Sequence, residues 1–152
     1  MSAPPILYVE DDENDGFLLR RAFAKVGIPN PLEVLTDGSQ AIEYLGQFGP
    51  HASQHIPPLM LLDLKMPFKT GFEVLEWLRR HPALRTVPVI ILTSSTQETD
   101  VHKAYVLGAN AYLVKPPQAE QLIAVVEAIR DFWLSLNVKP PDALAFKDTS
   151  FQ

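Results

Sequence analysis

Side chains that can do chemistry follow four short apolar runs of this 152-residue chain. At or next to the ends of these runs stand Glu10, Asp11, Asp12, Asp63, Thr93 and Lys115. If the runs are parallel strands of one sheet, their carboxyl ends meet at one edge, where open α/β sheets bind their ligands. The sequence therefore predicts one site that combines several carboxylates with a single ammonium.

Carboxylates that converge within a few ångströms raise one another's pKa, so they do not all stay ionised without a cation. Mg²⁺ prefers oxygen ligands and is commonly held by one or two carboxylates together with phosphate oxygens. Glu10 and Asp11 are the residues expected to bind it, directly or through water. We therefore predict a magnesium site at the end of the first strand.

Asp63 follows four apolar residues, LMLL, and a carboxylate beside Mg²⁺ can act as a nucleophile toward a phosphoryl group. Lys115 would supply a point charge to the phosphoryl oxygens, and the hydroxyl of Thr93 a hydrogen bond. The three residues together predict a phosphoryl acceptor that forms an aspartyl-phosphate.

Purely structural interpretations exist for each of these residues. An acidic turn such as EDDEND often caps a helix, an isolated lysine is usually solvated, and a threonine after a strand can be an N-cap. Asp63 resists this interpretation, because a charge after a buried apolar run is costly unless it is paired or metal-bound. The chemical interpretation explains all of the residues at once.

The elements that must position these residues alternate along the chain. Helical periodicity predicts helices at residues 14–26, 71–80, 97–107 and 118–136, and a short helix that carries Ala41, Ile42 and Leu45. Apolar runs predict strands at residues 6–9, 32–35, 59–62, 87–92 and 111–114. The helix at 97–107 is expected to bury Val101, Ala104 and Tyr105. This order predicts an α/β fold, a (βα)5 doubly wound five-stranded parallel sheet.

Composition excludes several classes of protein. The chain has 47% hydrophobic and 20% charged residues, no cysteine and a net charge of −5, which argues against disulfides, thiolate chemistry and nucleic acid as a partner. It shows neither a membrane span nor a signal peptide, so we expect a cytoplasmic location without a membrane partner.

Residues 46–58 are predicted to form a long loop in which His51 and His55 are solvent-exposed rather than metal-bound. Residues 1–136 are expected to form the domain, and residues 137–152 a C-terminal extension.

Four ordered blocks give the chain its resemblance to a known family: ILYVEDDE, LMLLDLKMPFKTGFEVL, VPVIILTSS and GANAYLVKP. Over residues 6 to about 134 the chain resembles the response-regulator receiver domain of two-component signalling, whose fold is flavodoxin-like. The resemblance implies an acidic metal-binding pair at Glu10 and Asp11, a phosphorylated aspartate at Asp63, a metal-binding backbone carbonyl at Lys65, a switch hydroxyl at Thr93, a switch aromatic at Tyr112 and the family's lysine at Lys115. A one-residue slip of register would exchange Asp12 for Glu10, and that alternative stays open. In the family the bond that corresponds to Lys115–Pro116 is typically cis.

The function that the resemblance implies is signalling rather than enzymatic catalysis. A sensor histidine kinase would transfer a phosphoryl group to Asp63, and Thr93 and Tyr112 would then change the surface that partner proteins read. The long loop and the extended last helix also resemble the single-domain regulators of phytochrome-type kinases. Additional apolar residues on that helix, Ile123, Phe132, Leu134 and Leu136, predict a homodimer or a kinase contact, to which Phe146 and Phe151 of the tail could contribute.

Three other functions fit parts of the pattern. A Mg²⁺-dependent phosphohydrolase would use the same aspartyl-phosphate, but it needs a second acid two residues later, where Lys65 stands. A flavin-binding carrier needs a phosphate-cradling loop after the first strand, and the acidic cluster there would repel phosphate. An adaptor with a silent site is the third alternative.

Overall fold

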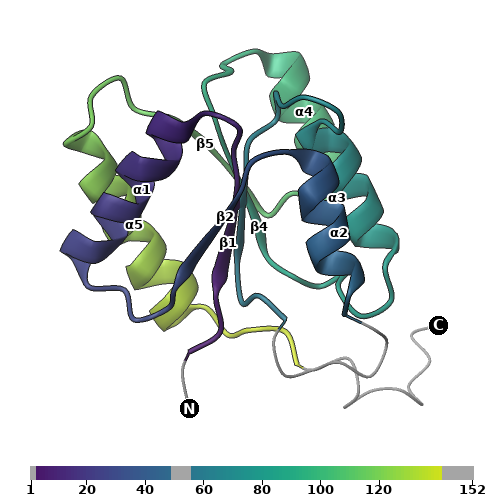
Figure 1. Ribbon diagram of the computed structural model, residues 1–152, viewed down its shortest axis with the longest axis horizontal. Helices are drawn as coiled ribbons and strands as arrows, with labels where there is room; N and C mark the ends of the chain where they lie inside the picture. Colours follow the sequence, from purple (N-terminus) through teal and green to yellow (C-terminus); the bar gives the residue numbers. More distant parts are fainter. Residues whose placement is uncertain (1–2, 49–55, 142–152) are drawn as a thin grey trace.

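The computed structural model describes residues 3–48 and 56–141 and contains one five-stranded parallel sheet between two layers of helices (Figure 1). The elements are β1 (Ile6–Val9), α1 (Glu13–Val26), β2 (Leu32–Leu35), α2 (Gly38–Gly46), β3 (Met60–Leu62), α3 (Gly71–Arg80), β4 (Val89–Thr93), α4 (Glu98–Val106), β5 (Ala111–Val114), α5 (Gln121–Asp131) and η1 (Phe132–Leu136). The strands lie in the order β2-β1-β3-β4-β5. The predicted doubly wound (βα)5 fold is confirmed.

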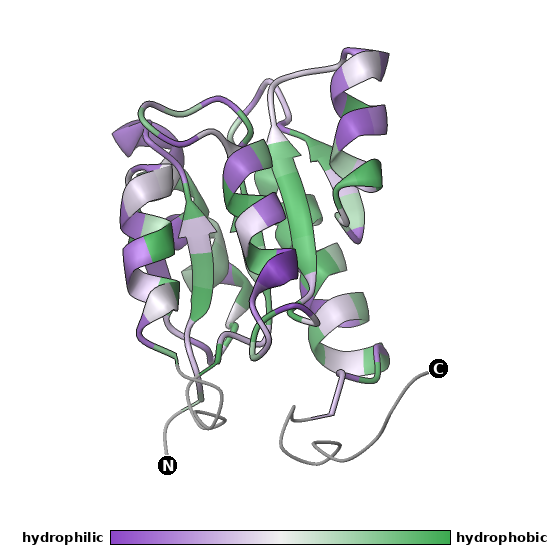
Figure 2. Cartoon of the chain, turned by 90° about the vertical axis from the view of Figure 1, so that its right-hand side faces the viewer, coloured by the Kyte–Doolittle hydropathy of each residue, from purple (hydrophilic) through white to green (hydrophobic). Residues whose placement is uncertain are grey.

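The central strands are buried on both faces, which explains their uninterrupted apolar sequences. In β1, Leu7 and Val9 face the core beneath α2 and α3, whereas Ile6 and Tyr8 face the core beneath α1 and α5. Figure 1 shows the two helical layers on opposite sides of the sheet. In Figure 2 the strands are mostly green, whereas the helices that cover them have both green and purple stretches. The apolar runs therefore place the carboxyl ends of β1, β3 and β4 at the centre of one edge.

Capping residues fix where the helices that follow these strands begin and end. Asp12 caps α1, and Gly27, with φ 81°, ends it in the left-handed conformation that glycine tolerates. Thr70 and Glu73 form a capping box at the start of α3. The loops after β1 and β3 are consequently held at both of their ends.

The last helix differs from its prediction at residues 118–136. The regular α5 begins only at Gln121, because the preceding residues form tighter turns in which Leu122 N–H donates to Ala119 O at 3.1 Å. It ends at Asp131 and continues as the π-helix η1, whose last turn closes through a bond from Asn137 N–H to Phe132 O at 2.6 Å. A wider turn replaces the regular one predicted there.

The prediction for the helix at 97–107 is wrong in one residue. Of its three expected core residues only Ala104 is fully buried, while Val101 is half-buried and the side chain of Tyr105 is 49% exposed. This helix, α4 in the structure, packs beside β5, the last strand of the sheet, through a narrow face. The small side chain of Ala104 is enough to fill that contact.

At the opposite, amino edge of the sheet a guanidinium joins two loops. Arg79, near the end of α3, donates to Gly108 O at 2.7 and 3.0 Å, to Val87 O at 2.8 Å, to Arg85 O at 2.9 Å and to Asn110 Oδ1 at 2.9 Å. All of these acceptors are neutral. This contact fixes the segments that lead into β4 and β5.

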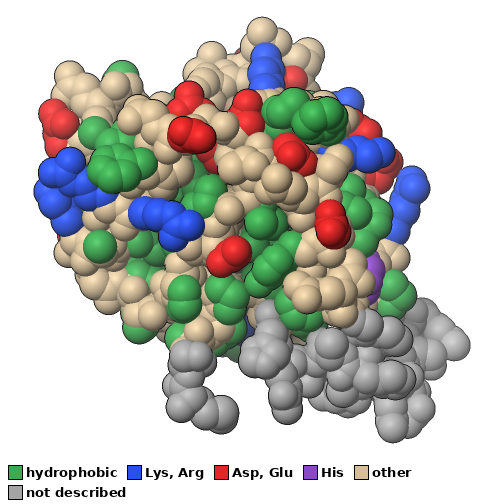
Figure 3. Space-filling model, in the orientation of Figure 1, with side chains coloured by type: hydrophobic (Ala, Val, Ile, Leu, Met, Phe, Trp, Pro, Cys, Tyr) green, Lys and Arg blue, Asp and Glu red, His purple; other side chains and the backbone are tan. Residues whose placement is uncertain are grey.

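The surface of the described residues is mixed in charge. Figure 3 shows acidic and basic side chains interspersed on one face. Among residues 3–48 and 56–141, no helix is both long and apolar enough to cross a membrane. The predictions for His51, His55, Phe146 and Phe151 fall outside the residues that the structure describes.

Candidate functional site

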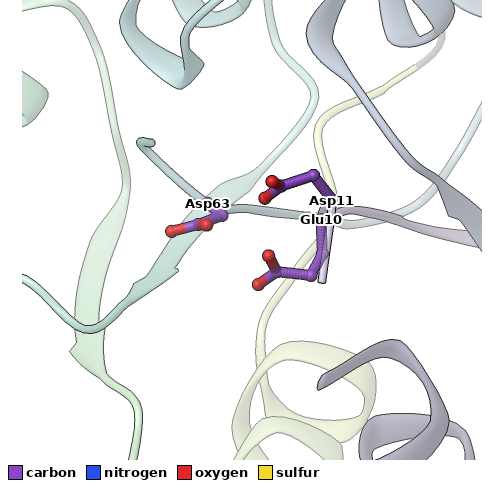
Figure 4. Close-up of side chains that lie close together, drawn as sticks. All are labelled: Glu10, Asp11 and Asp63. Carbon is purple, nitrogen blue, oxygen red and sulfur yellow. The ribbon is translucent and has the colours of Figure 1, made fainter. Parts of the chain in front are cut away.

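Three carboxylates from two neighbouring strands meet at the carboxyl edge of the sheet. One oxygen from each of Glu10, Asp11 and Asp63 lies within 4.8 Å of the other two. Figure 4 shows Glu10 and Asp11, which follow β1, with their carboxylates on the side where Asp63 lies. Glu10 and Asp63 are buried, at 2% and 5% exposed, whereas Asp11 is open to solvent. The structure thus brings together the acidic residues that the sequence predicted.

The position of Asp63 follows from strand pairing and one close packing contact. The backbone N–H of Asp63 donates to Val9 O at 3.1 Å, which extends the β1–β3 pairing by one residue. Its Oδ1 accepts a bond from Leu64 N–H at 2.9 Å. Gly71, the first residue of α3, approaches so closely that a Cβ there would lie 2.2 Å from Asp63 O. Only glycine allows α3 to begin directly behind the acceptor.

Lys115, which follows β5, brings a side-chain ammonium into contact with these carboxylates. Its Nζ donates to Glu10 and, at 2.8 Å, to Asp15, and it lies 3.7 Å from Asp63 Oδ2. Burial alone would lower the pKa of Lys115, but the hydrogen bonds that it donates to Asp15 and Glu10 and the charge of Asp63 outweigh burial and raise the pKa. The lysine therefore stays charged and links the carboxylates of Glu10, Asp15 and Asp63.

The peptide bond between Lys115 and Pro116 is trans, so the cis form that the resemblance implied is not present. The backbone N–H of Lys115 donates to Thr93 O at 2.8 Å, which continues the β4–β5 pairing beyond Val114. This pairing places the lysine beside the site without the cis bond.

Glu10 is the most unusual ionisable group of the site. Burial above all, together with the charge of Asp63, raises its pKa to about 7 against the lowering effect of the Lys115 ammonium. Tyr8 donates its hydroxyl to Glu10 Oε1 at 3.0 Å. A buried carboxylate that is this costly to ionise, within reach of two more carboxylates, offers the hard oxygen donors that a divalent cation needs.

Asp12 has a different place from Glu10, although the two could exchange roles in the sequence. The Oδ1 of Asp12 accepts bonds from Asn14 N–H at 2.8 Å and Asp15 N–H at 3.0 Å, as the N-cap of α1. The group of three converging carboxylates includes Glu10 and leaves out Asp12. The side chain of Lys65, whose backbone carbonyl was expected to bind the metal, is exposed.

The two expected switch residues both form hydrogen bonds with Ser95, in the loop that follows β4. Thr93, the last residue of β4 and 1% exposed, accepts a bond on Oγ1 from Ser95 N–H at 3.4 Å. Tyr112 of β5 donates its hydroxyl to Ser95 O at 3.0 Å, and burial raises the pKa of this phenol. Ser95 also donates from Oγ to Asp100 Oδ2 at 2.6 Å. Thr93 and Tyr112 are therefore connected through the backbone of Ser95.

Two contributors to the site were missed from the sequence, Tyr8 and Asp15. Asp15 lies three and four residues before Leu18 and Leu19, which face α5, so helical periodicity turns its carboxylate inward. Tyr8 lies two residues before Glu10 and shares its side of the strand. The periodicity of the flanking elements was the available signal for both residues.

The fold and the site together define the class of protein. It is a doubly wound α/β protein with a group of carboxylates at the carboxyl edge of its sheet that can bind a cation. Comparison with known families then gives the family. The response regulator receiver domain matches residues 6–127 of the chain. The chain belongs to this family and is a response regulator of two-component signalling, in which phosphorylation of an aspartate is the general mechanism.

Individual relatives match over nearly their whole length. FilR2, a probable methanogenesis regulatory protein of Methanothrix harundinacea, is 39% identical over 91% of this chain and 88% of its own. The response regulator Rcp1 of a Synechocystis strain is 38% identical over 91% of this chain and 96% of its own. The phosphorylated cyanobacterial phytochrome response regulator RcpA has a crystal structure with a TM-score of 0.83, 36% identity and coverage of 92% of this chain and 100% of that one.

A further crystal structure bears on the acidic pocket. The Mn²⁺-bound form of response regulator Rcp1 matches with a TM-score of 0.80 and 37% identity, covering 91% of this chain and 100% of that one. The metal-bound relative and the three converging carboxylates of this chain both indicate a site for a divalent metal.

Proposed function

We propose that Asp63 accepts a phosphoryl group from the phosphohistidine of a sensor histidine kinase, with Mg²⁺ bound beside it. Glu10, Asp11 and Asp63 would hold the ion through carboxylate oxygens, and Lys65 through its backbone carbonyl. The observation that carries this proposal is the convergence of three carboxylates within 4.8 Å, with the Lys115 ammonium 3.7 Å from Asp63.

The residues of the site divide the work of the transfer. An oxygen of Asp63 forms the new O–P bond as the N–P bond of the phosphohistidine breaks, and the imidazole leaves with the bonding electron pair. Lys115 faces the growing negative charge on the phosphoryl oxygens, and Leu64 N–H orients the attacking carboxylate through Oδ1. Bound Mg²⁺ supplies charge neutralisation to the same oxygens.

Phosphorylation would be read through Thr93 and Tyr112. Rotation of the Thr93 hydroxyl toward the phosphoryl group removes the acceptor of Ser95 N–H. Because Tyr112 bonds the carbonyl of that same residue, its orientation changes with the loop. The surface of α4, β5 and α5 thereby changes between two states, and partner proteins recognise the difference.

The partners follow from the relatives and the last helix. The similarity to the phytochrome response regulator RcpA supports a phytochrome-type kinase, whereas the comparable similarity to FilR2, a probable methanogenesis regulatory protein, does not favour that type over other sensor kinases. Residues 1–136 would act as the receiver and residues 137–152 as an extension. A cytoplasmic location without membrane or nucleic-acid partners fits a regulator that works through protein contacts.

A homodimer through the last helix is part of the same proposal. The side chains of Phe132 and Leu136 are 49% and 75% exposed, so they leave apolar surface for a second copy. Sedimentation velocity at micromolar concentration should show a dimer that Phe132→Asp shifts to monomer. A wild-type monomer both before and after phosphorylation would contradict the dimer.

Incubation with acetyl phosphate and Mg²⁺, followed by intact mass measurement, tests the central proposal. The wild type should gain one phosphoryl group, Asp63→Asn should gain none, and Asp12→Asn, which keeps the helix cap, should behave as the wild type does. No adduct on the wild type would favour the silent adaptor. Steady release of phosphate from added phosphate esters, lost in Asp63→Asn, would favour the phosphohydrolase.

A further inference from the structure

Asp15 is a carboxylate that contacts the site and has no role in the proposed chemistry. It lies in the first turn of α1, with its side chain 32% exposed, and its Oδ2 is 2.8 Å from Lys115 Nζ. Oδ2 of Asp63, the proposed phosphoacceptor, lies 3.7 Å from the same Nζ. In this state of the protein the lysine is therefore closer to Asp15 than to the residue it would serve.

Asp15 also differs from Glu10, the other hydrogen-bond acceptor of Lys115. Glu10 belongs to the converging group of carboxylates, which leaves out Asp15. A divalent cation held by that group would draw on the oxygens of Glu10 and weaken their bond to the ammonium. Asp15 lies outside that group, so its oxygens would stay available to Lys115.

The ammonium has room to change partners. Asp15 and Lys115 line a cavity of about 190 Å³ together with Tyr8, Leu19 and Pro117. The lysine stem is flexible and borders this open space, and its Nζ already lies 3.7 Å from Asp63 Oδ2, so a change of partner needs only a small movement. Water can take its place at the partly exposed carboxylate of Asp15.

We propose that Asp15 is a positioning residue that competes with the phosphoryl group on Asp63 for the Lys115 ammonium. This inference rests on the proposed phosphorylation of Asp63. Each time the phosphoryl group is gained, Lys115 exchanges one anion for another, and each time it is lost the exchange reverses. The carboxylate of Asp15 therefore loosens the hold on the phosphoryl group and shortens the life of the phosphorylated state.

Beryllofluoride, a non-covalent mimic of the phosphoryl group, tests this competition in the presence of Mg²⁺. Calorimetric titration should show that Asp15→Asn binds the mimic more tightly than the wild type, by roughly three- to tenfold, the range expected for a partly exposed charge pair. Glu13→Gln removes the same charge from the same helical turn, where its side chain is exposed, and should change the affinity less than twofold.

A second measurement separates competition from general damage to the site. The affinity for Mg²⁺ alone should not increase in Asp15→Asn, because the substitution removes negative charge near the cation. Equal affinities for beryllofluoride in Asp15→Asn and Glu13→Gln, or weaker binding in Asp15→Asn, would overturn the role of Asp15. A wild type that binds no beryllofluoride would instead overturn the proposed function.

Discussion

Lys115 and Arg79 are partly buried cations at opposite edges of the sheet, and they have opposite kinds of partner. At the carboxyl edge, Lys115 faces the carboxylates of Glu10, Asp15 and Asp63. At the amino edge, Arg79 faces three backbone carbonyls and the side-chain oxygen of Asn110. One cation has charged partners and the other has only neutral ones.

The difference separates a functional cation from a structural one. The planar guanidinium of Arg79 matches fixed carbonyls at several points, so any movement breaks several bonds at once. Burial lowers the pKa of Arg79, and no carboxylate among its partners opposes that effect. The ammonium of Lys115 bonds carboxylates whose charge changes with protons, metal or a phosphoryl group. Its partners can be exchanged, and those of Arg79 cannot.

The largest expected effect is on phosphoryl transfer. Lys115→Met keeps an unbranched stem and removes the ammonium, so we expect the rate constant of phosphorylation by acetyl phosphate to fall roughly 100-fold, as when one electrostatic contact to a transition state is lost. The rate is measured from intact mass against time, below the unfolding transition.

Arg79→Met is the control for that experiment, because it removes a partly buried cation from the other edge. It should phosphorylate within a few-fold of the wild-type rate at a temperature where it is folded. Equal losses in the two variants would break the distinction between the edges.

The next effect is on stability. Arg79→Met leaves the carbonyls of Gly108 and Val87 without their side-chain donor, and we expect the free energy of unfolding in urea to fall by about 3 kcal/mol. Arg79→Lys keeps the charge but cannot reproduce the fork, so it should recover less than half of the loss. Full recovery by lysine would show that charge, not geometry, matters at this edge.

The smallest expected effect is a dependence on pH. The pKa of Glu10 is raised in the folded protein to about 7 from an ordinary value of 4.5, so the folded state holds this proton more tightly than the unfolded state. The contribution of Glu10 to stability is therefore greatest below about pH 4.5 and is lost as the pH rises through 7.

Glu10→Gln removes this dependence. Without added metal, the free energy of unfolding of the variant relative to the wild type should rise between pH 4.5 and pH 7 by an amount on the order of 2 kcal/mol. For Arg79→Met the corresponding difference should stay flat across the same window. A flat profile for Glu10→Gln would mean that Glu10 ionises as an ordinary carboxyl.

The sequence predicted the fold and the strand ends well because both depend on local pattern. Asp63, Thr93 and Lys115 each stand directly after an apolar run, so their place at the carboxyl ends of the strands could be predicted before their neighbours in space were known. The roles of Asp15 and Arg79 depend on which helix packs beside which strand end, and such contacts join residues far apart in the chain. The turn at η1 and the exposure of Tyr105 depend on fine packing, which periodicity does not determine.

The distance along the chain between Glu10 and Lys115 has a consequence for protein synthesis. The two residues that bond in the pocket are 105 positions apart, and the lysine follows the last strand. A polypeptide still on the ribosome can carry both the first acids and Asp63 while it lacks its ammonium. The pocket is therefore complete only after Lys115 has been synthesised and β5 has joined the sheet.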